Sequence, residues 1–483
     1  MHSKYESKCD KCDKIFNSKY KYTQHQKRKT SCVNEKNEQE VKAKRVEESN
    51  DSLINEITID TSSMHELKIY YDKTLNIDKS TYTSSNDEPT PIDCITEMIG
   101  KIPPELWVKT DLSILDPCCG NGNFHLAILD KLLNYHDKRH VLENILEFND
   151  INESRLENVR NVFCSEKYNL QITRHDFITF DNDKKYDLIV ANPPYAKILE
   201  NGKRASKNHN LIKDFMEKAL SQLKPNGYIL FITPDNWMSY ADRNVLIKKI
   251  TSLQMIHLDI HNAKKYFKSI GSSFTWYIIQ NCEFYKNINV TGIWKKKEYV
   301  SSVISKQRNY IPLLYNEYVQ KILSKTVDDK NLLKFDVKTS SDLHKYTKAE
   351  FIRAEKTDMF KYKLIHTPKQ TVYASRPHKF QNGYKVFIST TDKYKVFIDD
   401  CGMTQSIVFI LCTDKTQATN YLNILEHPLY IFINNICRWG NFNNIRILQK
   451  FPIPLIDYSG NHAEIYDYFN ITKDEIDYIS MNL

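Results

Sequence analysis

The apolar residues in the middle of this chain form short runs that alternate with stretches of helical periodicity. Runs of about four to eight apolar residues are typical of buried strands, and an apolar repeat of three to four residues is typical of amphipathic helices. The expected strands cover residues 113–116, 144–149, 170–173, 186–191 and 228–233, with two more near 255–260 and 274–281. The expected helices cover residues 123–134, 153–163 and 211–223. Alternating strands and helices predict a parallel, doubly wound, Rossmann-like α/β sheet.

Changes in composition divide the 483 residues into four zones. Residues 1–33 are basic and contain cysteines, and residues 34–75 are polar and charged, which is typical of a disordered linker. Residues 76–284 carry the strand–helix alternation. Residues 285–483 are predicted to form a separate C-terminal α+β domain, with its last helix-like segment near 416–437.

The composition narrows the setting in which the protein works. A net charge of +8 is compatible with a polyanionic partner. The 11 cysteines are odd in number and scattered, which indicates reduced thiols. Neither a signal peptide nor an apolar run of ~18 residues is visible, so no membrane association is expected. We expect a soluble intracellular protein, in the cytoplasm (for example at a viral replication site) or the nucleus.

The segment Asp116–Phe124 combines an acid with two of the chain's 11 glycines directly after a strand. Gly120 and Gly122 allow a tight turn and a close approach of the backbone to a ligand. Asn123 and Phe124 open the next helix, whose amides can meet a carboxylate. Asp116 can receive an ammonium group. S-adenosylmethionine carries both groups, whereas a dinucleotide carries a pyrophosphate.

Two further acids follow successive strands. Asp150 comes after the second strand, where an acid can accept the hydroxyls of a ribose. Asp176 follows the third strand and can accept the adenine amino group, and Phe177 can cover the adenine ring. This ordered set favours S-adenosylmethionine as the cofactor.

The tetrapeptide Asn192-Pro193-Pro194-Tyr195 follows the strand 186–191 and can hold a planar amino group. The side-chain oxygen of Asn192 and the carbonyl of Pro193 can each accept one N–H of the amine. Pro193 and Pro194 fix the backbone, because each ring locks its own φ. Tyr195 offers a flat face to a base. The tetrapeptide therefore predicts methyl transfer to an amine nitrogen.

With Thr90-Pro91 ahead of both motifs, the chain resembles the gamma-class DNA adenine-N6 methyltransferases of restriction–modification systems. The resemblance implies that Thr90 and Pro91 contact the methionine part of the cofactor and that residues 285–483 form a target-recognition domain. It also implies double-stranded DNA as substrate, a flipped-out target adenine, a monomeric enzyme and a cognate restriction endonuclease. Phe267 is a candidate for the second face of the base, or else a core residue.

Two alternatives stay open at this point. Related tetrapeptides also serve enzymes that methylate RNA adenine or a protein glutamine amide. The size of residues 285–483 argues against that alternative, because such a length suffices for a domain that reads a duplex. The other alternative is a non-catalytic zinc-finger DNA-binding protein on a methyltransferase scaffold, which the intact motifs disfavour.

The N-terminal zone follows a CCHC-type zinc-finger template. Two cysteines on a hairpin and a histidine on a helix can converge on a tetrahedral Zn²⁺. A fourth ligand that is a cysteine six residues beyond the histidine departs from the usual closely spaced histidine. The expected ligands are Cys9, Cys12, His25 and Cys32. Basic residues between 19 and 29 can contact DNA, but the finger can equally bind protein, or these residues are simply a solvated face.

The C-terminal zone offers three polar, loop-like segments that can reach base edges or are ordinary surface loops. They are His366–Pro368, Arg376–His378 and Gly402–Ser406.

Overall fold

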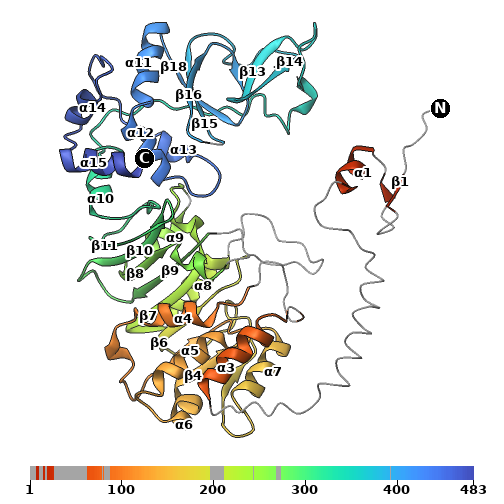
Figure 1. Ribbon diagram of the computed structural model, residues 1–483, viewed down its shortest axis with the longest axis vertical. Coiled ribbons are helices and arrows are strands. Elements are labelled where there is room, and N and C mark those ends of the chain that lie inside the picture. The colour runs from red at the N-terminus through yellow and green to blue at the C-terminus, as the bar shows by residue number, and fades with distance from the viewer. Residues whose placement is uncertain are drawn as a thin grey trace. The chain divides into compact units, whose positions relative to one another are not determined.

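The computed structural model describes residues 7–9, 15–16, 19–26, 63–78, 80, 88–195, 211–242, 244–267, 273–391 and 393–483. The chain divides into two compact units, Met1–Leu67 and Lys68–Leu483. Figure 1 shows the elements of each unit. No helix in these described ranges combines the length and apolar character that crossing a membrane requires.

The first unit contains a small ββα arrangement. Strands β1 (Ser7–Lys8) and β2 (Ile15–Phe16) pair antiparallel, and helix α1 (Lys19–Gln26) follows. This order is the one expected of a zinc-finger template.

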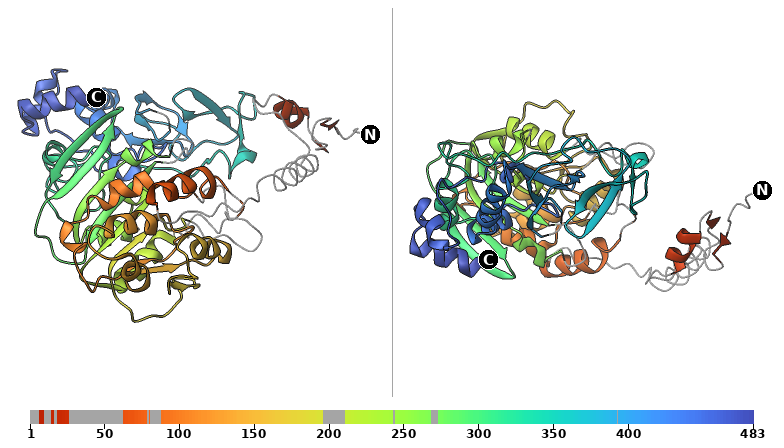
Figure 2. Two further views of the ribbon diagram at one scale, coloured as in Figure 1. Left: turned by 60° about the horizontal axis from the view of Figure 1, so that its bottom comes forward. Right: turned by 90° about the horizontal axis from the view of Figure 1, so that it is seen from above.

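The second unit is built on a nine-stranded sheet with the order β11-β10-β8-β9-β7-β6-β3-β4-β5. Its strands are β3 (Ile114–Asp116), β4 (Leu146–Asn149), β5 (Gln171–Thr173), β6 (Tyr186–Ala191), β7 (Leu223–Pro234), β8 (Gln254–Ile260), β9 (Phe274–Gln280), β10 (Ile288–Trp294) and β11 (Lys297–Val303). Strands β5, β4, β3, β6 and β7 run parallel, as the alternation of strands and helices predicts. Figure 2 gives two further views of this sheet and of the helices that pack against it.

The expectation of an all-parallel sheet is wrong at β9. This strand lies between β7 and β8 and runs antiparallel to both. In its described part, the connection from β8 to β9 holds only the short 3-10 helix Asn262–Lys265. A parallel return normally needs a crossover helix, so this connection favours an antiparallel return.

Helices connect and cover the strands. They are α4 (Ile92–Ile99), α5 (Asn123–Leu132), α6 (Lys138–His140), α7 (Glu153–Val162), α8 (Leu211–Ser221) and α9 (Val245–Ile250). Helix α8 buries Ile212, Phe215 and Met216 in the main core, together with β6 and β7. At ~25 cal/mol per Å² of buried apolar surface, such faces hold the helices on the sheet.

The predicted linker 34–75 is ordered at its end. Helix α3 (Met64–Tyr70) continues into a π-helical turn, Tyr71–Leu75, in which Tyr71 and Leu75 are buried. Residues 34–62 lie outside the described residues. The buried aromatic and aliphatic side chains explain why this end of the segment folds.

The sheet also continues beyond residue 284, because the hairpin β10–β11 pairs with β8. Residues 304–483 then form helices and two smaller sheets, β12-β14-β13-β17 and β16-β15-β18. The strands are β12 (Ile352–Arg353), β13 (Tyr362–Thr367), β14 (Gln370–Ala374), β15 (Lys385–Ser389), β16 (Val396–Asp399), β17 (Gly402–Met403) and β18 (Ile407–Leu411). The helices are α10 (Glu317–Ser324), α11 (Lys415–Leu425), α12 (Pro428–Ile436), α13 (Ile445–Leu448), α14 (His462–Tyr468) and α15 (Lys473–Asn482).

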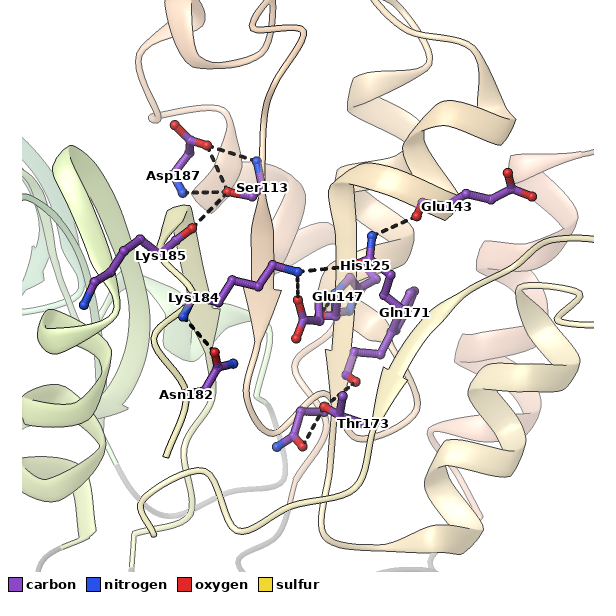
Figure 3. A network of polar contacts seen from close by, with 12 residues as sticks. Ser113, His125, Glu143, Glu147, Gln171, Thr173, Asn182, Lys184, Lys185 and Asp187 are labelled. Carbon is purple, nitrogen blue, oxygen red and sulfur yellow. Dashed lines mark hydrogen bonds and ion pairs between the residues drawn. The ribbon is translucent and has the colours of Figure 1, made fainter. Parts of the chain in front are cut away.

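Figure 3 shows a network of polar contacts that joins strands β3 to β6. Asp187, near the start of β6, accepts hydrogen bonds from the backbone and hydroxyl of Ser113 and from Lys109 and Lys224. Lys184 forms an ion pair with Glu147 of β4. These contacts stabilise the scaffold and leave the opposite, carboxyl edge to the loops described next.

Candidate active site

The loop after β3 bends where glycine is required. Gly120 and Gly122 have φ values of +55° and +86°, a backbone conformation that residues with a side chain rarely adopt. A Cβ on Gly122 would lie 2.8 Å from the ring of Phe163. The N–H of Cys119 donates to the carbonyl of Asn149 at 2.9 Å, which joins this loop to the end of β4. The predicted Gly loop therefore lies at the carboxyl edge of the sheet.

Two buried carboxyl groups, Asp116 and Asp150, border this loop. Asp116 Oδ1 accepts the N–H of Cys118 at 3.1 Å, and Asp150 Oδ2 accepts the N–H of Gly120 at 2.9 Å. Burial raises the pKa of Asp116 well above its ordinary value, and the neighbouring Asp150 adds to the rise. A cationic ligand would relieve both effects.

The third loop, after β5, is fastened to the same edge by Asn149. Asn149 Nδ2 donates to the carbonyls of Pro117 and His175, and its Oδ1 accepts the N–H of His175. Asp176 is exposed, whereas Phe177 is buried and packs on Phe215 with ring centroids 5.5 Å apart. Three loops that each follow a parallel strand thus meet, and Asn149 is the residue that holds them.

The N-terminal segment that precedes the sheet, residues 71–76, also contacts the Gly loop, and no sequence pattern predicted this contact. The Tyr71 hydroxyl donates to the carbonyl of Asn121 at 2.6 Å, and both residues are buried. Asn123 Nδ2 donates to Asn76 Oδ1 at 3.0 Å. These partners are 47 or 50 residues apart in the chain, so no local pattern identifies them.

The tetrapeptide after β6 has its Asn side chain held in one orientation. Asn192 Nδ2 donates to the carbonyl of Glu88 at 3.0 Å and to Thr90 Oγ1 at 3.1 Å. The Tyr195 hydroxyl donates to Asn192 Oδ1 at 2.5 Å, so both ends of the Asn192 amide have hydrogen-bond partners. Within the described residues, no group donates a hydrogen bond to the carbonyl of Pro193.

Thr90 joins the tetrapeptide to the Gly loop. Its hydroxyl accepts from Asn192, and its carbonyl accepts from Asn123 Nδ2 at 2.9 Å. Cys118 Sγ lies 3.6 Å from the carbonyl oxygen of Asn192 and links the two motifs a second time. Pro91 follows as the residue that precedes α4. The structure thus brings 116–124 and 192–195 together at one edge of the sheet.

A row of three aromatic rings begins at Tyr195 of the tetrapeptide. The ring of Tyr195 lies 6.4 Å from that of Phe274, which lies 4.9 Å from the ring of Phe267. Phe267 is buried against Phe274, so its described position is that of a core residue beside the site.

Two other groups of expected site residues come from the C-terminal region and from the finger. In the C-terminal loops, His366 and His378 are buried and hydrogen-bond to Thr404 and Ser340, so they serve packing instead of surface contact. In the finger, Cys9 and His25 are buried, and Cys12 and Cys32 lie outside the described residues. Among the residues whose positions are described, no cluster of three or more metal-ligating side chains is present.

The fold and site together define a Rossmann-like α/β domain whose carboxyl edge suits S-adenosylmethionine. Comparison with known proteins agrees with this class. Residues 94–267 match the family model described as Eco57I restriction-modification methylase. The matched stretch contains the Gly loop, the tetrapeptide and strands β3 to β8.

Individual relatives are distant. The chain is 26% identical over 254 residues to the Type II methyltransferase M.HincII of Haemophilus influenzae, covering 49% of this chain and 45% of that protein. It is 24% identical over 366 residues to an uncharacterized adenine-specific methylase of Mycoplasma pneumoniae, covering 56% and 85%. The match thus spans less than half the length of M.HincII.

One solved structure has a similar fold over most of the chain. The cryoEM structure of a DrdV–DNA complex aligns with a TM-score of 0.52 at 11% identity, covering 89% of this chain and 60% of that one.

Proposed function

We propose that this protein is an S-adenosylmethionine-dependent DNA methyltransferase that acts on adenine N6 of a base flipped out of the helix. The observation that carries the proposal is the orientation of Asn192. Its Nδ2 donates two hydrogen bonds that fix the amide, and its Oδ1 accepts the hydroxyl of Tyr195. Within the described residues, the carbonyl of Pro193 accepts no hydrogen bond. Two such acceptors suit the two N–H bonds of an exocyclic amine.

The cofactor supplies an electrophilic methyl group when it is bound. Asp116 would pair with its ammonium, Gly120 and Gly122 would let the backbone approach it, and helix α5, which begins at Asn123 and Phe124, would receive its carboxylate. Asp150 would accept the ribose hydroxyls, with Asp176 and Phe177 at the adenine. Thr90 and Pro91 would lie against the methionine part.

The chain's own residues would orient and activate the amine. By accepting both N–H bonds, Asn192 and Pro193 hold the nitrogen and favour a pyramidal form whose lone pair is available. Pro194 keeps the clamp rigid, and Tyr195 stacks on the base once its hydroxyl leaves the Asn192 oxygen. Positioning of this kind supplies much of a transfer rate. An enzyme that acts on a base has to take it out of the stack.

The test is methyl transfer from labelled S-adenosylmethionine to DNA, RNA and protein in parallel. We expect incorporation into duplex DNA as N6-methyladenine. Asn192→Ala should reduce it by at least ~10²-fold, because the amine is no longer oriented, and should leave cofactor affinity within about twofold. Incorporation into RNA or protein but not DNA would reject the proposed substrate.

The remaining parts are assigned by the same proposal. Residues 285–483 would recognise the target sequence, and the finger would bind structural zinc through Cys9, Cys12, His25 and Cys32. A monomeric enzyme paired with a cognate restriction endonuclease stays a prediction.

A further inference from the structure

A cleft of about 370 Å³ lies between the loop after β7 and a loop of the C-terminal region. One wall consists of Asp235, Asn236, Ser239 and Tyr240. The other consists of side chains between Trp439 and Arg446. The cleft is thus formed by two segments about 200 residues apart, one attached to the catalytic sheet and one to the proposed recognition domain.

The wall that begins at Asp235 follows the carboxyl end of β7, the strand that pairs with β6. The last residue of β7, Pro234, pairs with Phe274. His261 Nε2 lies 2.7 Å from Asp235 Oδ2, and the N–H of His261 donates to the carbonyl of Phe274 at 3.2 Å. Phe274 is the ring that neighbours Tyr195. This wall of the cleft and the tetrapeptide therefore follow the carboxyl ends of two neighbouring strands.

Phe442 projects from the C-terminal wall with 62% of its surface exposed. It forms no ring contact with any described residue. Single exposed aromatic residues are common on protein surfaces and need no explanation by themselves. What distinguishes it is its position on the wall of a cleft whose other wall follows β7, the strand next to the one that carries the tetrapeptide.

The loop that carries Phe442 is held rigidly. The backbone of Phe442 forms a bridge with Thr391, and the N–H of Asn443 donates to the carbonyl of Thr390 at 2.9 Å. Asn443 Nδ2 donates to the carbonyl of Ser389 at 2.8 Å, and Trp439 Nε1 to that of Ile311 at 3.0 Å. A fixed backbone means that little conformational entropy would be lost when the ring meets a partner.

We propose that this cleft receives the substrate duplex beside the target adenine and that Phe442 stacks on the bases left behind when the adenine is extruded. The inference rests on the proposed function and adds a residue to it. Extrusion breaks base stacking, and an apolar side chain inserted at the base step can replace part of what is lost. Phe442 would thus favour the extruded state without touching the reacting nitrogen.

The test compares two duplexes that carry the sequence methylated by the wild-type protein. In one, the target adenine faces thymine; in the other, it faces an abasic site, so extrusion is already easier. Single-turnover methyl transfer is measured for the wild type, Phe442→Ala, Phe442→Trp and Phe284→Ala. Phe284 is an exposed aromatic residue outside the cleft lining and serves as the matched control.

We expect Phe442→Ala to be about tenfold slower on the paired duplex, the order of one lost base–aromatic stack. On the abasic duplex it should recover to within about twofold of the wild type. Phe442→Trp and Phe284→Ala should resemble the wild type on both. Phe442→Ala that is equally slow on both duplexes, or unaffected on both, overturns the inference while wild-type methylation still upholds the proposed function. If the wild type methylates no duplex DNA, so that no such sequence is found, both proposals are rejected.

Discussion

At the scale of single residues, the candidate site depends on a few buried polar groups whose partners are fixed. Asn149 fastens three loops, and Thr90 bridges the Gly loop and the tetrapeptide. Asp116, Asp150 and Asn192 were identifiable in the sequence because each is the last residue of a strand or directly follows one. Tyr71 and Asn149 were not, since their partners come from remote segments and side-chain hydrogen bonds of that kind leave no spacing pattern.

Tyr71→Phe tests the support that the N-terminal segment gives to the Gly loop. The change removes the hydroxyl that donates to the Asn121 carbonyl and leaves that buried acceptor without this partner. If the lost hydrogen bond lowers the binding free energy by about 1 kcal/mol, the affinity for S-adenosylmethionine should fall about fivefold. Titration calorimetry measures this effect. Tyr70→Phe, at the neighbouring position in α3, is the control and should bind as the wild type does.

We expect cofactor binding to depend on pH because of the raised pKa of Asp116. Its raised pKa means that the folded, ligand-free protein binds this proton more tightly than the unfolded chain does. A bound ammonium favours the carboxylate, so binding should release a proton, and affinity should fall as the pH is lowered through that pKa. Calorimetry in two buffers of different ionisation enthalpy detects the proton.

The same carboxyl group should lower the stability of the ligand-free protein. Because the folded-state pKa is raised, the stability contribution of Asp116 is present at low pH and is lost as the pH rises through that pKa. Asp116→Asn should therefore bind the cofactor poorly and still unfold at a temperature roughly 2 °C higher at pH 7. A lower unfolding temperature would contradict this account of the site.

At the scale of elements, sequence patterns predicted the strands that lie in the parallel half of the sheet. Strand β6 has the expected bounds because its apolar run lies between Lys184-Lys185 and the two prolines. The direction of β9 was missed, because an apolar run carries no sign of its orientation. The predicted helix near 416–437 is instead two helices, α11 and α12, because Pro428 begins a new helix and cannot donate to the previous one.

Asp187 is predicted to hold the strand starts together without affecting the site. Burial opposes its ionisation, but hydrogen bonds from Lys224 and Lys109 outweigh burial and hold its pKa below the ordinary value. Its stabilising contribution is therefore present at neutral pH and is lost as the pH falls through the lowered pKa.

Asp187→Ala should reduce the free energy of unfolding by about 2–3 kcal/mol at neutral pH. Asp187→Asn, which still accepts the hydrogen bonds of Ser113, should cost less. Urea denaturation measures both changes. Cofactor affinity at low temperature should be unchanged in both variants, and a loss of binding equal to the loss of stability would contradict the separation of scaffold and site.

At the scale of the whole molecule, the chain combines a small N-terminal unit with a large one. The ββα order of the first unit agrees with the zinc-finger template. We expect Cys9→Ser to remove about one zinc ion per chain, because a structural site needs all four ligands. Elemental analysis of the purified full-length protein measures the metal.

The same variant tests what the finger contributes to DNA binding. If the finger contacts phosphates, Cys9→Ser should weaken DNA binding and lower the slope of log affinity against log salt concentration by ~1 or more. The rate at saturating DNA should stay within about twofold of the wild type, since the site lies in the other unit. An unchanged salt slope in zinc-depleted protein would assign the finger a different partner.

The hairpin β10–β11 has a practical implication for redesign. Because it pairs with β8, a chimera that exchanged everything after residue 284 would strip two strands from the edge of the sheet and expose β8 to solvent. A chimera that exchanges the C-terminal region should instead be joined after Val303, where the last strand of the nine-stranded sheet ends.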